Sequence, residues 1–239
     1  MAKQPMAEAN RISQMLNVAL RGEERFPVNV EEVAFELCRS RYADEPIVDI
    51  TALDIDGFEG MLVRHPSGRK WKIGYNSQIK SKGRIRFTLA HEFGHYILHR
   101  ELRSKFQCTE KNMHEWDLDD RDIEAQADVF ASYLLMPLDD YREQIKGQKP
   151  SIDMLRHCSE RYGVSLMAAA LKWTEIASKR VVVLAVRDDF VLWARSSKSA
   201  YLSGVFLASR KSAIEVPDGS VLKSSSVLSG PKVGTLEAK

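Results

Sequence analysis

The sequence has few cysteines, no long apolar run and no leader-like start. Its three cysteines, Cys38, Cys108 and Cys158, are widely spaced and form no C-x-x-C pair. This argues against a disulfide framework and against a cysteine zinc site. No run of 18 apolar residues occurs, so we expect no membrane-spanning helix. The first ten residues lack the apolar segment of a secretory signal. We therefore expect a cytoplasmic protein with reduced thiols.

The chain also lacks a strong charge of either sign. Its 35 Lys and Arg residues nearly balance its 33 Asp and Glu residues, which leaves a formal net charge of +2. This balance favours neither a nucleic-acid partner nor a membrane surface. The hydrophobic share of 44% in 239 residues is that of an ordinary soluble globular protein. Such a length is enough for one sizeable core, or for one core with a small appended unit.

Apolar periodicity places helices along most of the first three quarters of the chain. We predict them over residues 6–20, 30–39, 84–99, 122–136, 151–163 and 165–177. A hairpin is expected where residues 60–64 and 71–75 flank the turn His65-Pro-Ser-Gly68. The acidic stretch 110–122 is expected to be irregular. After residue 180 the pattern becomes strand-like, over residues 180–186, 190–193, 201–207 and 214–216.

The motif that carries chemistry is His91-Glu-Phe-Gly-His95. Residues four apart lie on the same face of a helix, so both imidazoles can reach one metal ion. Glu92 lies beside that face, where its carboxylate can take a proton from a metal-bound water. The alternative is a pair of helix histidines satisfied by ordinary hydrogen bonds. The apolar residues around the motif predict a largely buried helix, which favours the metal because buried polar groups need partners.

A catalytic zinc site needs a third protein ligand. The metzincin pattern would place a histidine six residues after His95, but that residue is Glu101, and Leu98 replaces the required glycine. A glutamate from a second helix is the other common solution, and Glu124 is the best candidate. Small Ala127 and Ala131, with Gly94 opposite, would let the two helices approach closely. The acidic start of that helix can also be explained by solvation and by the helix dipole.

Asp128 lies four residues after Glu124, on the same helix face. From there its carboxylate can accept the second ring N–H of a ligand histidine and so fix that ring's orientation. Glu110 and Glu115 are weaker rivals for the third ligand. His99, four residues after His95, is interpreted as a structural or supporting residue because it lies too far along the helix to share the same ion.

Three segments together resemble the ImmA/IrrE family of zinc metallopeptidases: 86–99, which contains the motif, 124–128, and Phe130-Ala-Ser-Tyr-Leu-Leu-Met-Pro137. A weaker resemblance extends over about residues 25–175. The resemblance implies Zn²⁺ held by His91, His95 and Glu124, with Glu92 catalytic. Gln126 and Asp128 depart from the glutamate and asparagine that are frequent in the family. The resemblance also implies a protein substrate: a helix-turn-helix repressor of a prophage, mobile element or stress regulon.

We therefore expect an α+β fold with a zincin-like metallopeptidase core, which combines a small sheet, the H-E-x-x-H helix and a glutamate-bearing helix. A helical hairpin and a small β-rich C-terminal unit would follow. The predicted boundaries are residues 1–178 for the peptidase domain, 179–222 for the β-rich unit and 223–239 for a flexible tail. The expected activity is that of a zinc metallo-endopeptidase. The oligomeric state stays open.

Two functions of another class compete with this interpretation. Residues 151–177 have the outline of a DNA-binding helix-turn-helix, but the second helix offers little besides Lys172 to contact DNA. Direct binding of nucleic acid is therefore not expected. Alternatively, the chain is a regulatory or toxin–antitoxin module that binds a repressor without cleaving it. The intact Glu92 favours chemistry, because binding alone needs no general base.

Overall fold

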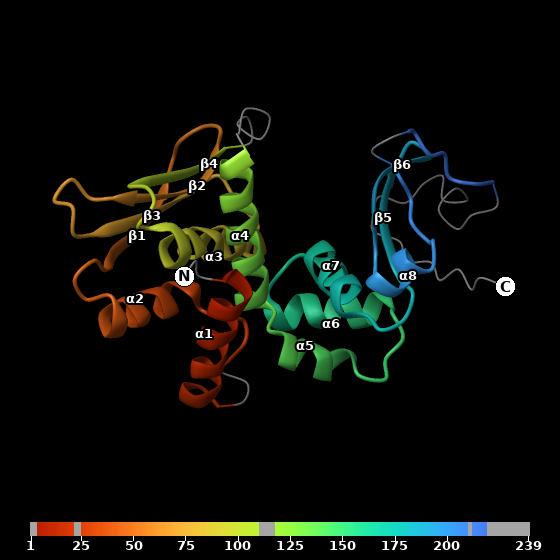
Figure 1. Ribbon diagram of the computed structural model, residues 1–239, viewed down its shortest axis with the longest axis horizontal. Helices are drawn as coiled ribbons and strands as arrows, with labels where there is room; N and C mark the ends of the chain where they lie inside the picture. The colour runs from red at the N-terminus through yellow and green to blue at the C-terminus, as the bar shows by residue number, and fades with distance from the viewer. Residues whose placement is uncertain (1–3, 22–24, 110–117, 210–211, 219–239) are drawn as a thin grey trace. The chain divides into compact units, whose positions relative to one another are not determined.

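The computed structural model describes residues 4–21, 25–109, 118–209 and 212–218, except for the side chains of residues 108–109 and 118–119. Its mixed helices and strands confirm the predicted α+β class. The chain divides into two compact units, which are described separately: residues 1–140 with 160–165, and residues 141–159 with 166–239 (Figure 1). None of the described helices is long and apolar enough to cross a membrane.

A four-stranded sheet and four helices make up most of the first unit. The strands are β1 (Ile47–Leu53), β2 (Phe58–Arg64), β3 (Trp71–Asn76) and β4 (Lys105–Thr109), and the helices are α1 (Pro5–Ala19), α2 (Val30–Arg41), α3 (Lys82–His99) and α4 (Leu118–Leu135). The strand order is β1-β3-β2-β4. The predicted hairpin is present as the antiparallel pair β2–β3, and β3 also pairs in parallel with β1. Strand β3 is therefore an internal strand of this sheet.

Helix α3 begins where Ser81 caps it, because the Ser81 hydroxyl accepts a hydrogen bond from the Arg84 N–H. The helix packs against β2 and β3 on one side and against α4 on the other (Figure 1). Phe93 and Ile97 of α3 are fully buried, as are Leu62 and Ile73 of the sheet. The core of this unit therefore lies directly beneath the His91–His95 segment.

Helices α3 and α4 approach closely at Gly94. A Cβ atom at this position would lie 3.0 Å from the Phe130 ring and 3.3 Å from the Ala127 backbone. Ala127 and Ala131 are fully buried on the facing side of α4. Small residues on both helices thus bring the two backbones together, as their spacing predicts, and a larger residue at position 94 would push α4 away from the motif.

Helix α4 starts earlier than the sequence pattern predicts. It begins at Leu118 rather than at residue 122 and ends at Leu135, just before Pro137. Glu124 consequently lies in the second turn of the helix and is not one of its terminal residues. The predicted irregular stretch is wrong for residues 118–122, and its residues 110–117, which include the rival ligands Glu110 and Glu115, lie outside the described residues.

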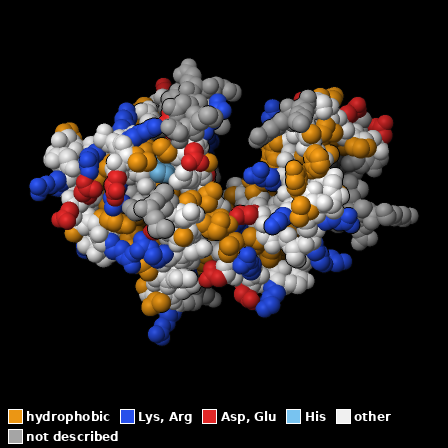
Figure 2. Space-filling view, viewed as in Figure 1, with side chains coloured by type: hydrophobic (Ala, Val, Ile, Leu, Met, Phe, Trp, Pro, Cys, Tyr) orange, Lys and Arg blue, Asp and Glu red, His pale blue; other side chains and the backbone are white. Residues whose placement is uncertain are grey.

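The second unit contains helices and one strand pair. Helices α5 (Leu138–Ile145) and α6 (Ile152–Tyr162) lie partly in it, followed by α7 (Leu166–Ile176), β5 (Val182–Arg187), β6 (Phe190–Ser196) and α8 (Lys198–Leu202). Strands β5 and β6 form an antiparallel hairpin. Several apolar side chains of this unit are exposed, among them Phe190, Leu192, Tyr201 and Phe206, and Figure 2 shows hydrophobic side chains gathered on its surface.

Two predicted strands of the C-terminal unit differ from the structure. Residues 201–207 were expected to be extended, but Lys198–Leu202 form α8 and residues 203–209 form no strand. The Ser197 hydroxyl accepts a hydrogen bond from the Ala200 N–H, so an N-cap outweighs the aromatic and β-branched composition. Residues 214–216 contribute a single bridge, between Glu215 and Phe190. The proposed tail, residues 223–239, lies outside the described residues.

Candidate metal centre

The two histidines of the motif converge because they lie one turn apart on α3. His95 is fully buried, and only 7% of His91 is exposed. Their Nε2 atoms are 3.0 Å apart, with the rings edge to face. Phe106 of β4 stacks on the His95 ring, with 4.6 Å between ring centroids. Both Nε2 atoms are therefore held at one point between α3 and the neighbouring elements.

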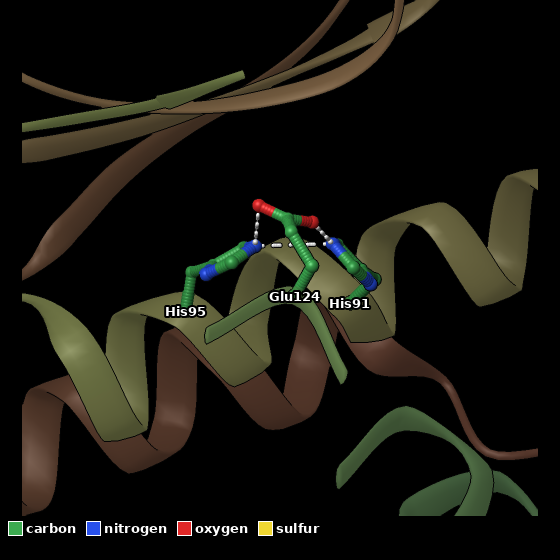
Figure 3. A group of neighbouring side chains, drawn as sticks. All are labelled: His91, His95 and Glu124. Carbon is green, nitrogen blue, oxygen red and sulfur yellow. Dashed lines mark hydrogen bonds and ion pairs between the residues drawn. The ribbon is translucent and has the colours of Figure 1, made fainter. Parts of the chain in front are cut away.

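Glu124 reaches the same point from α4. Its Oε2 lies 3.0 Å from His91 Nε2, and its Oε1 lies 3.3 Å from His95 Nε2. One carboxylate oxygen is thus close to each ring (Figure 3). The ligand atoms of these three residues all lie within 4.8 Å of one another, an arrangement that can hold a metal ion. The Glu124 side chain is 15% exposed, so it is not a solvated residue of a helix terminus.

Asp128 contacts the outer nitrogen of His91. Its Oδ1 lies 3.0 Å from His91 Nδ1, and its side chain is 61% exposed. An ionised carboxylate can only accept, so His91 donates its Nδ1–H to Asp128. If His91 is neutral, its Nε2 then carries a lone pair directed at the Glu124 carboxylate.

This arrangement fits a divalent metal. Two imidazole nitrogens and a carboxylate are the donor set of many catalytic zinc sites. Zinc–ligand bonds of about 2.0–2.1 Å in a tetrahedral site separate the ligand atoms by roughly 3.3 Å. The separations of 3.0 Å and 3.3 Å found here need to change by only a few tenths of an ångström. A cation between these lone pairs would replace their mutual repulsion with coordination.

The inner nitrogen of His95 contacts His99. The two Nδ1 atoms are 3.1 Å apart, and His99 Nε2 lies 3.3 Å from Gln126 Oε1. The amide of Gln126 in turn donates from Nε2 to Asp122 Oδ2, at 2.7 Å. His99 thus has the supporting position that its spacing predicts. Gln126 and Asp122 had no predicted role at the site, although they lie four residues apart and therefore share one face of α4.

Burial sets the protonation of the inner histidines. The pKa of His95 is lowered to about 4, chiefly by burial, with the His91 and His99 rings adding to the shift and Glu124 opposing it. Burial likewise lowers the pKa of His99, and its hydrogen bond to Gln126 opposes this. Both rings are therefore neutral near pH 7, and a neutral imidazole has the lone pair that a metal requires.

Glu92 is fully buried and lies against strand β2. A Cβ atom at Gly60 would be 2.6 Å from Glu92 Oε1 and 2.5 Å from the Thr88 methyl group. Strand β2 therefore needs glycine at this position, because any side chain would occupy the space of the Glu92 carboxylate. The spacing of the motif predicts Glu92 beside the metal ligands, but it does not predict this contact with the sheet.

Comparison with known proteins gives the family of the chain. Residues 43–174 match the model of the IrrE N-terminal-like domain of the M78 peptidases. The match covers more than half of the chain, and the chain belongs to this family of metallopeptidases. The resemblance drawn from the motif and from residues 124–137 is thereby confirmed.

The matched region contains His91, His95, Glu92, Glu124 and Asp128. Among solved structures, a Mycobacterium tuberculosis transcriptional regulator is similar, with a TM-score of 0.49 and 12% sequence identity. The similarity covers 79% of this chain and 55% of that one, so the chain spans just over half the length of that protein. None of the curated proteins matches the chain.

Proposed function

We propose that the chain is a zinc-dependent endopeptidase with a zincin-like site, in which His91, His95 and Glu124 hold the metal. The observation that carries the proposal is the convergence of these three side chains from two helices, with Nε2 and carboxylate oxygen atoms 3.0–3.3 Å apart. Membership of a peptidase family supports the reaction class. Two imidazoles and one carboxylate suit zinc, and the resemblance to zinc metallopeptidases is what favours this metal.

Each residue of the proposed site has its own role in peptide-bond hydrolysis. Zinc held by His91, His95 and Glu124 would polarise the scissile carbonyl and would lower the pKa of a water bound beside it to about 7. Glu92 acts as the general base, taking a proton from the attacking water and delivering it to the nitrogen of the leaving amine. Asp128 holds His91 by accepting its Nδ1–H. Burial of Glu92 and His95 keeps bulk water away from this proton transfer.

The substrate we propose is a helix-turn-helix repressor of a prophage, mobile element or stress regulon, cleaved at few sites in the cytoplasm. Its support is the family resemblance. Direct DNA binding by α7 is disfavoured because Lys172, its one candidate phosphate contact, is buried and pairs with Glu175 at 3.2 Å. We also propose that residues 1–178 form the peptidase domain and that residues 179–222 form a separate small unit.

The test is incubation of the purified protein with any helix-turn-helix regulator whose gene neighbours its own. We expect cleavage into discrete fragments, which a zinc chelator abolishes and added Zn²⁺ restores. Glu92→Gln should bind the regulator and retain zinc but cut nothing. If the wild type binds the regulator without cleaving it, and Glu92→Gln behaves identically, the chain is a binding module and the peptidase proposal is wrong.

A further inference from the structure

A chain of four polar side chains leads from the surface of α4 to the buried ligand His95. Asp122 accepts from the Gln126 amide at 2.7 Å, Gln126 Oε1 lies 3.3 Å from His99 Nε2, and His99 Nδ1 lies 3.1 Å from His95 Nδ1. Asp122 and Gln126 are one turn apart on α4, and His95 and His99 are one turn apart on α3. The two helices thus share one continuous hydrogen-bond path.

The donor and acceptor roles along this path follow from its outer end. The ionised carboxylate of Asp122 can only accept, so it orients the Gln126 side chain with its NH₂ group outward and its Oε1 toward His99. Because Oε1 can only accept, His99 Nε2 must carry the proton and donate to it. A neutral His99 then has a lone pair on Nδ1.

That lone pair decides the tautomer of His95. The Nδ1 atom of His99 can only accept, so His95 must donate its own Nδ1–H across the 3.1 Å contact. The remaining lone pair of His95 is then on Nε2, which faces His91 and Glu124. If every donor and acceptor along this path were exchanged, His95 Nε2 would carry a proton and have no lone pair for a metal.

We propose that His99 and Gln126 are positioning residues that hold His95 in the tautomer whose Nε2 binds the metal. This inference rests on the proposed metal centre. Helix α4 would then orient both histidine ligands in addition to providing Glu124: His91 directly through Asp128, and His95 indirectly through Gln126 and His99. Such supporting partners fix the tautomer and ring orientation of a metal-bound histidine.

The first readout is the tautomer of His95 in the metal-free protein, followed by ¹⁵N NMR of its ring nitrogens. The wild type should show a single tautomer with the proton on Nδ1. In His99→Phe, which keeps a ring of similar volume but removes the acceptor, His95 should populate the Nε2–H form. In His99→Asn, the side-chain oxygen can replace Nδ1 as acceptor, so the Nδ1–H form should return.

The second readout is affinity for Zn²⁺, measured by competition with a chromophoric chelator. His99→Phe should weaken zinc binding by roughly 10–100-fold, the usual effect of losing such a partner, and His99→Asn should recover most of it. Gln126→Leu should act in the same direction without changing the buried core, because Gln126 is only half buried. Ala125→Leu, at an exposed position one residue earlier on α4, is the matched control and should bind zinc like the wild type.

The proposal is overturned if His99→Phe or Gln126→Leu keeps His95 in the Nδ1–H form with unchanged zinc affinity, or if His99→Asn is no better than His99→Phe. Should His99→Phe fail to fold, Gln126→Leu alone decides the question. Because the tautomer is measured without metal or substrate, its result does not depend on peptidase activity. Failure of the wild type to bind zinc would instead contradict the proposed function.

Discussion

Glu92 of α3 and Gly60 of β2 are in direct contact: a Cβ at position 60 would lie 2.6 Å from Glu92 Oε1. The sheet therefore forms one wall of the space that holds the proposed general base. Because Glu92 is fully buried, its carboxylate has little room to move aside. The position of the Glu92 carboxylate thus depends on a residue 32 positions earlier, outside the motif.

Replacing Gly60 with alanine should displace Glu92 without removing a metal ligand. We expect Gly60→Ala to lower the rate of substrate cleavage by about 10²-fold, the effect of a misplacement of roughly 1 Å, while zinc affinity stays close to that of the wild type. The measurements are single-turnover cleavage and chelator competition on the same preparation. A wild-type cleavage rate in Gly60→Ala would show that a Cβ atom at position 60 does not displace Glu92, and it would contradict this prediction.

The contact between Asp128 and His91 predicts that two substitutions of Asp128 differ in their effect on zinc affinity. Asp128→Leu removes the acceptor for His91 Nδ1–H and should weaken Zn²⁺ binding by about 10-fold, at the low end of such effects, because the side chain is 61% exposed. Asp128→Asn retains a carbonyl oxygen and should stay near the wild type. Tighter zinc binding by Asp128→Leu than by Asp128→Asn would contradict the proposed role of Asp128 as the acceptor for His91.

Asp140 should contribute to the acid sensitivity of the fold. Burial alone would raise the pKa of Asp140, but hydrogen bonds from Arg161 and Tyr162 outweigh it and lower that pKa. Arg161 donates to both carboxylate oxygens at 2.7 and 2.8 Å, and the Tyr162 hydroxyl donates at 2.6 Å. A carboxyl whose pKa is lower in the folded state stabilises it above the unfolded pKa of about 3.9, and the stabilisation is lost as the pH falls further.

We therefore expect Asp140→Asn to reduce the free energy of unfolding by about 1.5–3 kcal/mol at pH 7, the range for hydrogen bonds to a charged group. Urea denaturation at pH 7 and near pH 3 measures this, and the difference between variant and wild type should shrink at the lower pH. Asp139→Asn, at the exposed neighbouring position, is the control and should behave like the wild type at both pH values. An equal decrease in the free energy of unfolding at both pH values would rule out the hydrogen bonds to the charged Asp140 carboxylate as the cause of the decrease.

Local sequence patterns predicted the parts of the fold that carry the site. The apolar period of residues 84–99 and the stop at Pro137 placed α3 and α4, and the four-residue spacing of His91 and His95 predicted their convergence. Glu124 was predicted only as the best of several acids, because the distance between two helices is a tertiary property. Gly94 and Ala127 were the sequence signal that these helices pack closely.

Other parts could not be read from short-range patterns. Strand β4, Lys105–Thr109, was not predicted, because its residues are mixed in polarity and its pairing partner β2 lies more than 40 residues earlier. The path from His95 through His99 to Gln126 depends on how α3 and α4 are rotated against each other. Periodicity specifies which face of a helix is buried but not which polar groups meet across the interface.

The zinc content of the purified protein is the decisive measurement, because α3 and α4 together are proposed to bind one zinc ion. Elemental analysis after dialysis against trace Zn²⁺ should find one zinc per chain in the wild type and in Glu92→Gln, and almost none in Glu124→Ala. Zinc retained at full stoichiometry and affinity in Glu124→Ala, or lost in Glu92→Gln, would contradict the assignment of these two glutamates.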